Sequence, residues 1–257
     1  MRRCRVVRAR GLLVAVVDPD SVDAVVFDMG GVFVVPHFEP IGEAIQAAGV
    51  DVHPDPVDSH RAHYHGVRAI TDRLAHQEVV ETDRRIWADY DRAYFTSIGV
   101  PVGSLDDVVA ARDAQRTDGI KGIWRQLIDH NVDGFARIAR SRAVAIVSNN
   151  DGTAVEQCLE LEICQVGDGT LTSVAAIVDS TVLGIAKPDP RIFDPAIEAL
   201  GTARERTLYV GDTVHADVLG AGAAGMPVVQ LDPFDLHDDH LHWRLPDVAA
   251  LAEHLCG

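Results

Sequence analysis

Positive charge is scarce in this sequence. Lys and Arg together number 23, against 39 Asp and Glu, so the formal net charge is −16 at pH 7. A surface with this excess of negative charge repels the phosphates of nucleic acids and the head groups of anionic membranes. We therefore expect a protein that has neither a nucleic-acid partner nor a membrane partner.

Cysteine and long apolar runs are also in short supply. The four cysteines (Cys4, Cys158, Cys164 and Cys256) show no CxxC spacing, so we expect reduced thiols and a cytoplasmic location. No apolar run approaches the roughly 18 residues that a membrane-spanning helix needs. The basic start and short apolar run of residues 1–20 are interpreted as an N-terminal extension rather than as a signal peptide.

Five apolar runs stand out instead. They are near-continuous rather than alternating, which is typical of strands buried on both faces of a parallel sheet. Helical patterns follow three of them, over residues 154–163, 190–201 and 216–226. Strands that alternate with helices in this way indicate right-handed crossovers. We therefore predict an α/β fold, a three-layer doubly wound parallel sheet, with strands within residues 23–28, 143–148, 175–180, 207–212 and 227–232.

The segment between the first and second predicted strands is far too long for an ordinary strand-to-helix connection. It contains no comparable apolar run. Helix-like stretches occupy residues 40–50, 63–79 and 82–99. We predict an inserted α-helical cap at 38–124 and a core formed by 21–37 and 125–257. A cap inserted at this point is expected to act as a lid that excludes water.

Polar residues follow the predicted strands at the point where each strand ends. In open α/β sheets, ligands bind beyond the carboxyl ends of the strands, so we expect these side chains to converge on one crevice. Buried carboxylates in one place repel each other unless a cation joins them, and a hard divalent ion such as Mg²⁺ is suited to that position. The candidate residues are Asp28, Ser148, Asn149, Lys187, Asp212 and Asp217.

These residue types are suited to phosphoryl transfer. A carboxylate such as Asp28 can attack phosphorus and form an aspartyl-phosphate, which water then cleaves. The charge of Lys187 can orient the nucleophile or a phosphate group. Ser148, together with backbone N–H groups at the start of the next helix, can hold the remaining phosphate oxygens.

Four motifs in this order resemble those of the haloacid dehalogenase superfamily, chiefly its phosphatases with a helical cap between the first two motifs. The motifs read FDMGGV, IVSNNDG, AKPDPRIF and YVGDTVHADVLGAGAAGM. The resemblance covers nearly the whole chain from about residue 20 onward. It implies a Mg²⁺-dependent phosphatase that acts on a small phosphorylated substrate.

The resemblance also implies a role for each candidate residue. Asp28 would be the nucleophile and a metal ligand, and the backbone carbonyl of Gly30 would reach the same metal. Ser148 and Asn149 would bind phosphate, and Lys187 would orient both nucleophile and phosphate. In the fourth motif, Asp212 would bind the metal, with Asp217 as a further ligand or as support for the others.

Gly30 departs from the family pattern, because the phosphatases usually carry a second Asp there as general acid and base. Such help is worth about 10²–10⁴-fold in rate. Three explanations stay open. In the first, the substrate has a good leaving group, and some phosphatases of the family do carry glycine here. In the second, a group from the cap supplies the proton, with His37 the nearest candidate in sequence. In the third, the protein is a catalytically weak metal- and phosphate-binding protein that acts by interaction.

The dehalogenase alternative and two groups of histidines are set aside for the following reasons. The dehalogenase branch also lacks the second Asp but uses no metal, so the retained fourth-motif carboxylates favour a phosphatase. The histidines of HRAHYHGVR (60–68) are expected on a solvated helix, and those of DPFDLHDDHLHW (232–243) in a polar loop before the last helix. The substrate and the oligomeric state are not fixed by these patterns.

Overall fold

The computed structural model describes residues 5–9, 12–76, 84–115 and 123–257. The chain divides into two compact units: Met1–Phe33 with Ile128–Gly257, and Val34–Leu127. The second unit extends a few residues beyond the segment expected from the sequence on both sides. The reason is an antiparallel pair of short strands, β4 (Val34–Pro36) and β5 (Trp124–Leu127), which joins the two ends of this unit.

The first unit is built on a six-stranded sheet in which every neighbouring pair is parallel. The five predicted strands are all present, and the predicted fold class is confirmed. A sixth strand of only two residues was missed, because it contains no apolar run. In spatial order the strands are β12 (Arg244–Leu245), β11 (Val228–Leu231), β10 (Thr207–Gly211), β3 (Ala24–Phe27), β6 (Ala143–Ser148) and β9 (Ile177–Asp179).

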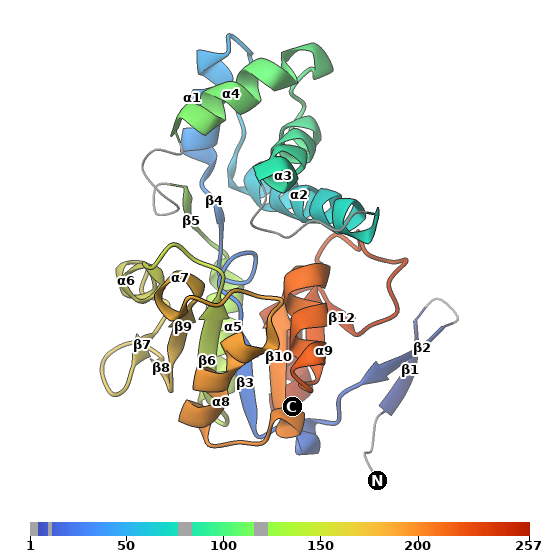
Figure 1. Ribbon diagram of the computed structural model, residues 1–257, viewed down its shortest axis with the longest axis vertical. Coiled ribbons are helices and arrows are strands. Elements are labelled where there is room, and N and C mark those ends of the chain that lie inside the picture. Colours follow the sequence, from blue (N-terminus) through green and yellow to red (C-terminus); the bar gives the residue numbers. More distant parts are fainter. Residues whose placement is uncertain (1–4, 10–11, 77–83, 116–122) are drawn as a thin grey trace. The chain divides into compact units, whose positions relative to one another are not determined.

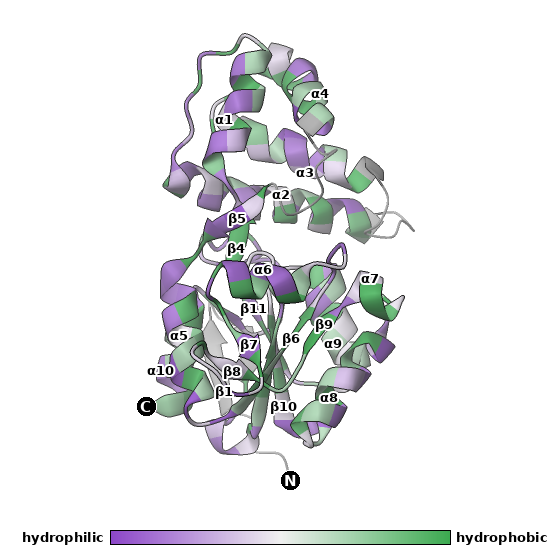
Figure 2. Ribbon diagram, turned by 90° about the vertical axis from the view of Figure 1, so that its left-hand side faces the viewer, coloured by the Kyte–Doolittle hydropathy of each residue, from purple (hydrophilic) through white to green (hydrophobic). Residues whose placement is uncertain are grey.

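Helices cover both faces of this sheet. Figure 2 shows α5 (Asp129–Ala139) and α10 (Val248–Cys256) on one side, and α8 (Asp194–Leu200) with α9 (Gly220–Ala223) on the other. On the first side, the Phe27 and Phe135 rings meet edge-on with centroids 5.1 Å apart. The central strands β3 and β10 are buried over their whole length, which explains why their sequences are apolar without alternation.

Smaller elements complete this unit (Figure 1). The helical part of the fourth motif begins as a π-helix, Val214–Leu219, after the strand β10. Strands β1 (Arg5–Ala9) and β2 (Leu12–Val16) form an antiparallel hairpin within the segment that the sequence analysis treats as an extension, of which residues 1–4 and 10–11 lie outside the described part. The others are α6 (Ala154–Glu160), α7 (Ser180–Leu183), β7 (Gln165–Val166), β8 (Ser173–Val174), and short 3₁₀ turns at Pro19–Ser21, Pro190–Phe193 and Arg204–Arg206.

The second unit consists mainly of helices around their own apolar cluster, which includes Ile86, Tyr94 and Phe95. One expectation fails here: His63 is buried rather than solvated, and its Nδ1 lies 2.9 Å from the Tyr90 hydroxyl. No described helix is both long and apolar enough to span a bilayer. The helices are α1 (Phe38–Ala47), α2 (Pro56–His76), α3 (Arg84–Ser97) and α4 (Leu105–Gln115), with a 3₁₀ turn at Val102–Ser104.

Gly134 of α5 packs against the backbone of α10, and we predict that Gly134→Ala destabilises the first unit. A Cβ there would lie 2.8 Å from backbone atoms of Val248 and Ala249, which cannot move aside as a side chain can. We expect a loss of about 1–3 kcal/mol, measured as a lower melting temperature. The matched control is Gly222→Ala in α9, where a Cβ meets nothing within 4 Å; equal melting temperatures for the two variants would contradict the prediction.

Candidate active site

The first, third and fourth motifs meet at the carboxyl end of the sheet. Asp28 directly follows β3, and its Oδ1 lies 2.8 Å from Nζ of Lys187. The same Nζ lies 2.8 Å from Oδ1 of Asp217. All three side chains are almost completely buried. Residues separated by 189 positions in the chain therefore form one ion-pair cluster, as the strand-end argument requires.

Both carboxylate oxygens of Asp217 accept hydrogen bonds within this cluster. Its Oδ2 accepts hydrogen bonds from the backbone N–H groups of Asp212 (3.1 Å) and Thr213 (2.9 Å) and from the Thr213 hydroxyl (2.8 Å). Its Oδ1 accepts from Lys187 Nζ and from the Tyr209 hydroxyl, both at 2.8 Å. Since a carboxylate offers about four lone pairs, these five donors favour support of Lys187 over direct binding of a metal.

Glycines shape two turns of the site. A Cβ on Gly211 would lie 2.3 Å from Cγ of Asp217, so only glycine lets that carboxylate fold back under the turn. Gly31 has a φ of 65°, in the left-handed region that favours glycine, whereas Gly30 has no positive φ. The backbone at Gly30 is therefore compatible with an ordinary side chain, and the missing Asp is not a requirement of the turn.

Burial and mutual repulsion shape the protonation of these groups. Burial, reinforced by the carboxylates of Asp217 and Asp212, raises the pKa of Asp28 to about 7 against the opposing charge of Lys187. Burial and Asp217 likewise raise the pKa of Asp212 well above its ordinary value. Burial would raise the pKa of Asp217, but the charge of Lys187 and the hydrogen bonds from Lys187 and Thr213 together lower it. Burial alone would lower the pKa of Lys187, but Asp217 and Asp28 hold it above the usual range.

The residues present fit a divalent metal ion. Asp28, Asp212 and Asp217 each bring one carboxylate oxygen within 4.8 Å of the others. Only one lysine lies among these three carboxylates in the contacts described above. Oδ1 of Asp28 is buried and forms no hydrogen bond of good geometry in the described part of the chain, although Lys187 lies close. A hard cation with oxygen ligands satisfies both the excess charge and this oxygen.

The second motif contributes Ser148 and Asn149. Ser148 ends β6, is buried, and lies opposite Asp179 of β9 in the parallel register. The amide of Asn149 holds the main chain of Lys187, with Oδ1 accepting from its N–H at 2.8 Å and Nδ2 donating to its carbonyl at 3.1 Å. Because both ends of this amide are engaged, the Asn149 side chain positions Lys187.

Sequence reasoning missed several supporting residues at this edge. Asp179 at the end of β9 accepts hydrogen bonds from the N–H groups of Gly152 and Ala154, and so fixes the loop after the second motif. The position of Asp179 at the end of a predicted strand could have identified it as a site residue. Gln230 donates to the Asp212 carbonyl at 2.8 Å. His237, expected in a polar loop, is buried, and its backbone N–H donates a hydrogen bond to Oδ2 of Asp232 at 2.9 Å.

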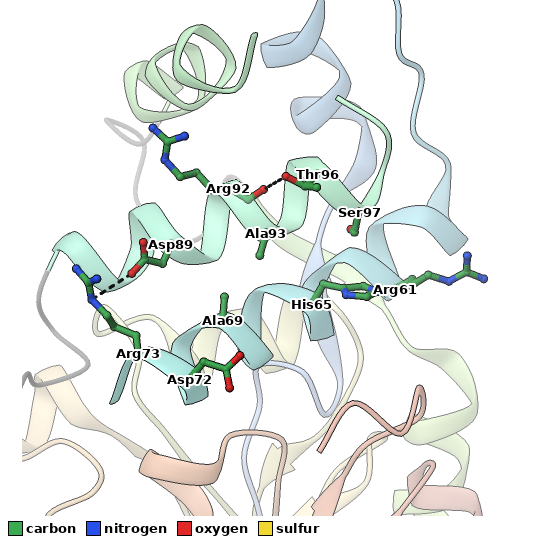
Figure 3. Close-up of a pocket in the computed structure, with 10 residues that line it drawn as sticks. All are labelled: Arg61, His65, Ala69, Asp72, Arg73, Asp89, Arg92, Ala93, Thr96 and Ser97. Atoms are coloured by element: carbon green, nitrogen blue, oxygen red, sulfur yellow. Dashed lines mark hydrogen bonds and ion pairs between the residues drawn. The ribbon is translucent and has the colours of Figure 1, made fainter. Parts of the chain in front are cut away.

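A groove of about 960 Å³ lies within the helical unit, between α2 and α3 (Figure 3). Its charged groups pair partly with each other: Nε of Arg73 lies 3.2 Å from Oδ2 of Asp89. Among the described residues that line it, the groove holds no carboxylate cluster comparable to that around Asp28, which favours the first unit as the location of the chemistry. Its lining residues are Arg61, His65, Ala69, Asp72, Arg73, Asp89, Arg92, Ala93, Thr96 and Ser97.

Comparison with known proteins identifies the family. The sequence model of the haloacid dehalogenase-like hydrolases matches residues 22–225, and the chain belongs to this family of hydrolases. A phosphoserine phosphatase from Thermus thermophilus is 36% identical over 159 residues, covering 57% of this chain but only 62% of the relative. The pyrimidine 5′-nucleotidase YjjG of Escherichia coli is 44% identical over 171 residues, covering 61% of this chain and 70% of the relative.

Solved structures agree on the fold. The putative HAD-hydrolase YfnB from Bacillus subtilis, determined with bound magnesium, has a TM-score of 0.55 at 15% identity and covers 91% of this chain and 98% of its own. A HAD phosphatase from Thermococcus onnurineus has a TM-score of 0.52 at 16% identity, and the match covers 92% of this chain and 99% of the other. These structures agree on the fold, and the family match over residues 22–225 confirms the superfamily resemblance seen in the sequence.

Proposed function

We propose that this protein is a Mg²⁺-dependent phosphatase that hydrolyses a small phosphorylated metabolite through an aspartyl-phosphate on Asp28. The observation that carries the proposal is the buried ion pair of 2.8 Å between Asp28 and Lys187, set among two further carboxylates. Relatives named as phosphoserine phosphatase, pyrimidine 5′-nucleotidase and glyceraldehyde 3-phosphate phosphatase support a small phosphorylated substrate.

The first chemical step uses Asp28 as the nucleophile. A carboxylate oxygen of Asp28 forms a bond to phosphorus as the bond from phosphorus to the leaving-group oxygen breaks. Lys187 keeps this carboxylate oriented and offers positive charge to the phosphoryl oxygens. Asp217 and Asn149 hold Lys187 in place from its side chain and its main chain. Ser148 binds a phosphoryl oxygen from the neighbouring strand.

Mg²⁺ would be held by Asp28, by the Gly30 carbonyl and by Asp212, with Asp217 as support. When bound, the ion supplies positive charge that stabilises the phosphoryl group during transfer. Asp212 is suited to this role because Gln230 fixes its carbonyl and the turn at Gly211 fixes its backbone.

The absence of an acid at position 30, where Gly30 stands, limits which leaving groups the substrate can have. With no acid at this position, the leaving-group oxygen departs as an anion, and in the second step water attacks phosphorus without a carboxylate base from this residue. The proposed substrates therefore have good leaving groups, such as acyl or anomeric phosphates. The competing interpretation, a weakly catalytic protein that binds metal and phosphate, also derives from Gly30.

A substrate panel tests the proposal. Hydrolysis of para-nitrophenyl phosphate, acetyl phosphate and an anomeric sugar phosphate is measured with and without Mg²⁺. We expect Mg²⁺-dependent turnover of all three, fastest with the best leaving group. Absence of turnover on every substrate, with Mg²⁺-dependent binding of vanadate retained, would contradict the phosphatase and favour the binding protein.

Removal of Mg²⁺ with a chelator is expected to abolish turnover, and added Mg²⁺ to restore it. The ion should also raise the melting temperature of the wild type by about 5–10 °C at 100 times its dissociation constant, because binding to the folded state adds about 2.7 kcal/mol. Asp212→Asn should lose most of this shift. Equal shifts in the wild type and in Asp212→Asn would place the ion elsewhere.

A cytoplasmic location is part of the proposal. The described cysteines, Cys158, Cys164 and Cys256, are free. Free thiols are typical of reducing compartments. We expect the small substrate to be the protein's main partner, and neither a nucleic acid nor a membrane.

A further inference from the structure

Tyr209 reaches from the apolar core to the charged site. It lies in the middle of β10, and its side chain is fully buried. Its ring meets the Phe193 ring edge-on, with centroids 5.0 Å apart, and its backbone pairs with Val26 of β3. Because core packing fixes the ring, the position of the hydroxyl is set independently of the charged residues.

The Tyr209 hydroxyl lies between two groups of opposite charge. It is 2.8 Å from Oδ1 of Asp217 and 3.0 Å from Nζ of Lys187, while the Val147 carbonyl is farther away at 3.4 Å. A hydroxyl has one proton to donate and lone pairs to accept with. It therefore donates to the Asp217 carboxylate and accepts a hydrogen bond from the Lys187 ammonium.

The Lys187 ammonium donates two hydrogen bonds, one to Oδ1 of Asp217 at 2.8 Å and one to the Tyr209 hydroxyl at 3.0 Å. Oδ1 of Asp28 lies 2.8 Å from the same nitrogen as its ion-pair partner. A lysine side chain is a flexible stem with a freely rotating head group. The two hydrogen bonds and the ion pair restrict that rotation, and the hydroxyl is the only uncharged one of these three neighbours.

We propose that Tyr209 is a positioning residue that locks the Lys187 ammonium beside Asp28. Its effect on catalysis rests on the proposed phosphatase function, whereas the lock itself is a property of the folded protein without substrate. The role requires only the hydroxyl oxygen, because the ring packs in the core. Phenylalanine at this position would preserve the packing and remove one of the two hydrogen-bond acceptors of the Lys187 ammonium.

The kinetic test compares Tyr209→Phe with the wild type on para-nitrophenyl phosphate. We expect kcat to fall by about 10- to 100-fold, the size of effect typical of a hydrogen bond to a charged group. KM should change by less than about threefold, because the lost contact acts on the transition state. The matched control is Tyr90→Phe, which removes another buried hydroxyl, bonded to His63; it should lower the melting temperature and leave kcat unchanged.

A measurement without substrate tests the lock directly. The ¹⁵Nζ resonance of Lys187 is recorded by NMR, assigned by its loss in Lys187→Met. We expect slow proton exchange in the wild type and exchange at least tenfold faster in Tyr209→Phe. Fast exchange in the wild type, or a Tyr209→Phe kcat within twofold of the wild type, would overturn the inference. If the wild type hydrolyses no phosphate ester, the proposed function fails and the NMR result alone decides on the lock.

Discussion

Asp28→Asn is expected to lower Mg²⁺-dependent hydrolysis of para-nitrophenyl phosphate by at least about 10³-fold. An amide cannot attack phosphorus to form a stable acyl phosphate, and it is a weaker ligand for Mg²⁺. The substitution nearly preserves the shape of the side chain. Lys187 keeps both of its hydrogen-bond acceptors, Asp217 and Tyr209. Loss of turnover should therefore occur in a folded protein.

The stability of this variant follows from the pKa of Asp28, which is raised to about 7. A carboxyl group whose pKa is raised on folding binds its proton more tightly in the folded state, so the metal-free protein loses stability as pH rises from about 4 to about 7, and the full loss is present above that range. Neutral Asn avoids this cost. At pH 8 without metal, Asp28→Asn should melt no lower than the wild type.

The matched control for this substitution is Asp23→Asn. Asp23 lies just before the other end of β3 and pairs with Arg206 on the surface. This variant should keep wild-type turnover within about twofold, since exposed ion pairs contribute little. Residual activity above about one per cent in Asp28→Asn, with Asp23→Asn unchanged, would remove Asp28 from the role of nucleophile.

Gly30→Asp is expected to extend turnover to alkyl phosphates, with a gain of about 10²–10⁴-fold on β-glycerophosphate. An acid at this position can protonate the leaving oxygen, which matters most when that oxygen is basic. Hydrolysis of para-nitrophenyl phosphate should change far less. The backbone accepts the side chain because Gly30, unlike Gly31, has no positive φ.

The control for this gain is Gly30→Asn, which adds a side chain of similar size without an acid. It should leave β-glycerophosphate unhydrolysed. Equal gains for Asp and Asn would show that the acid is not responsible. If the wild type is inert on good leaving groups as well and Gly30→Asp becomes active, the site is intact but lacks its acid, and the interaction protein becomes the better account.

The sheet and the identity of its charged residues were predictable because each depends on local sequence. A strand buried on both faces must be apolar throughout, which makes β3 and β10 visible as runs. A carboxylate or serine at the end of such a run, as at Asp28 and Ser148, is costly to bury without a partner. Three such strand ends, at Asp28, Ser148 and Asp212, together with the lysine of the third motif, were enough to indicate the site.

Side-chain partners across the fold were not predictable from the same patterns. In the sequence pattern, Tyr209 is indistinguishable from the apolar residues of β10. Only the folded structure brings its hydroxyl to Lys187. His63 and His237 look polar in sequence but are buried, because packing of α2 on its neighbours and folding of the 232–243 loop cover them. The two-residue strand β12 carries no periodic pattern to detect.

The most direct test of the account is to trap the phosphoenzyme. The wild type is mixed with radiolabelled acetyl phosphate and Mg²⁺, quenched in acid during turnover and digested, and the labelled peptide is identified. We predict label on the peptide that contains Asp28, with none without Mg²⁺ and none in Asp28→Asn. Turnover with no label on that peptide, or with label on another residue, would contradict the account.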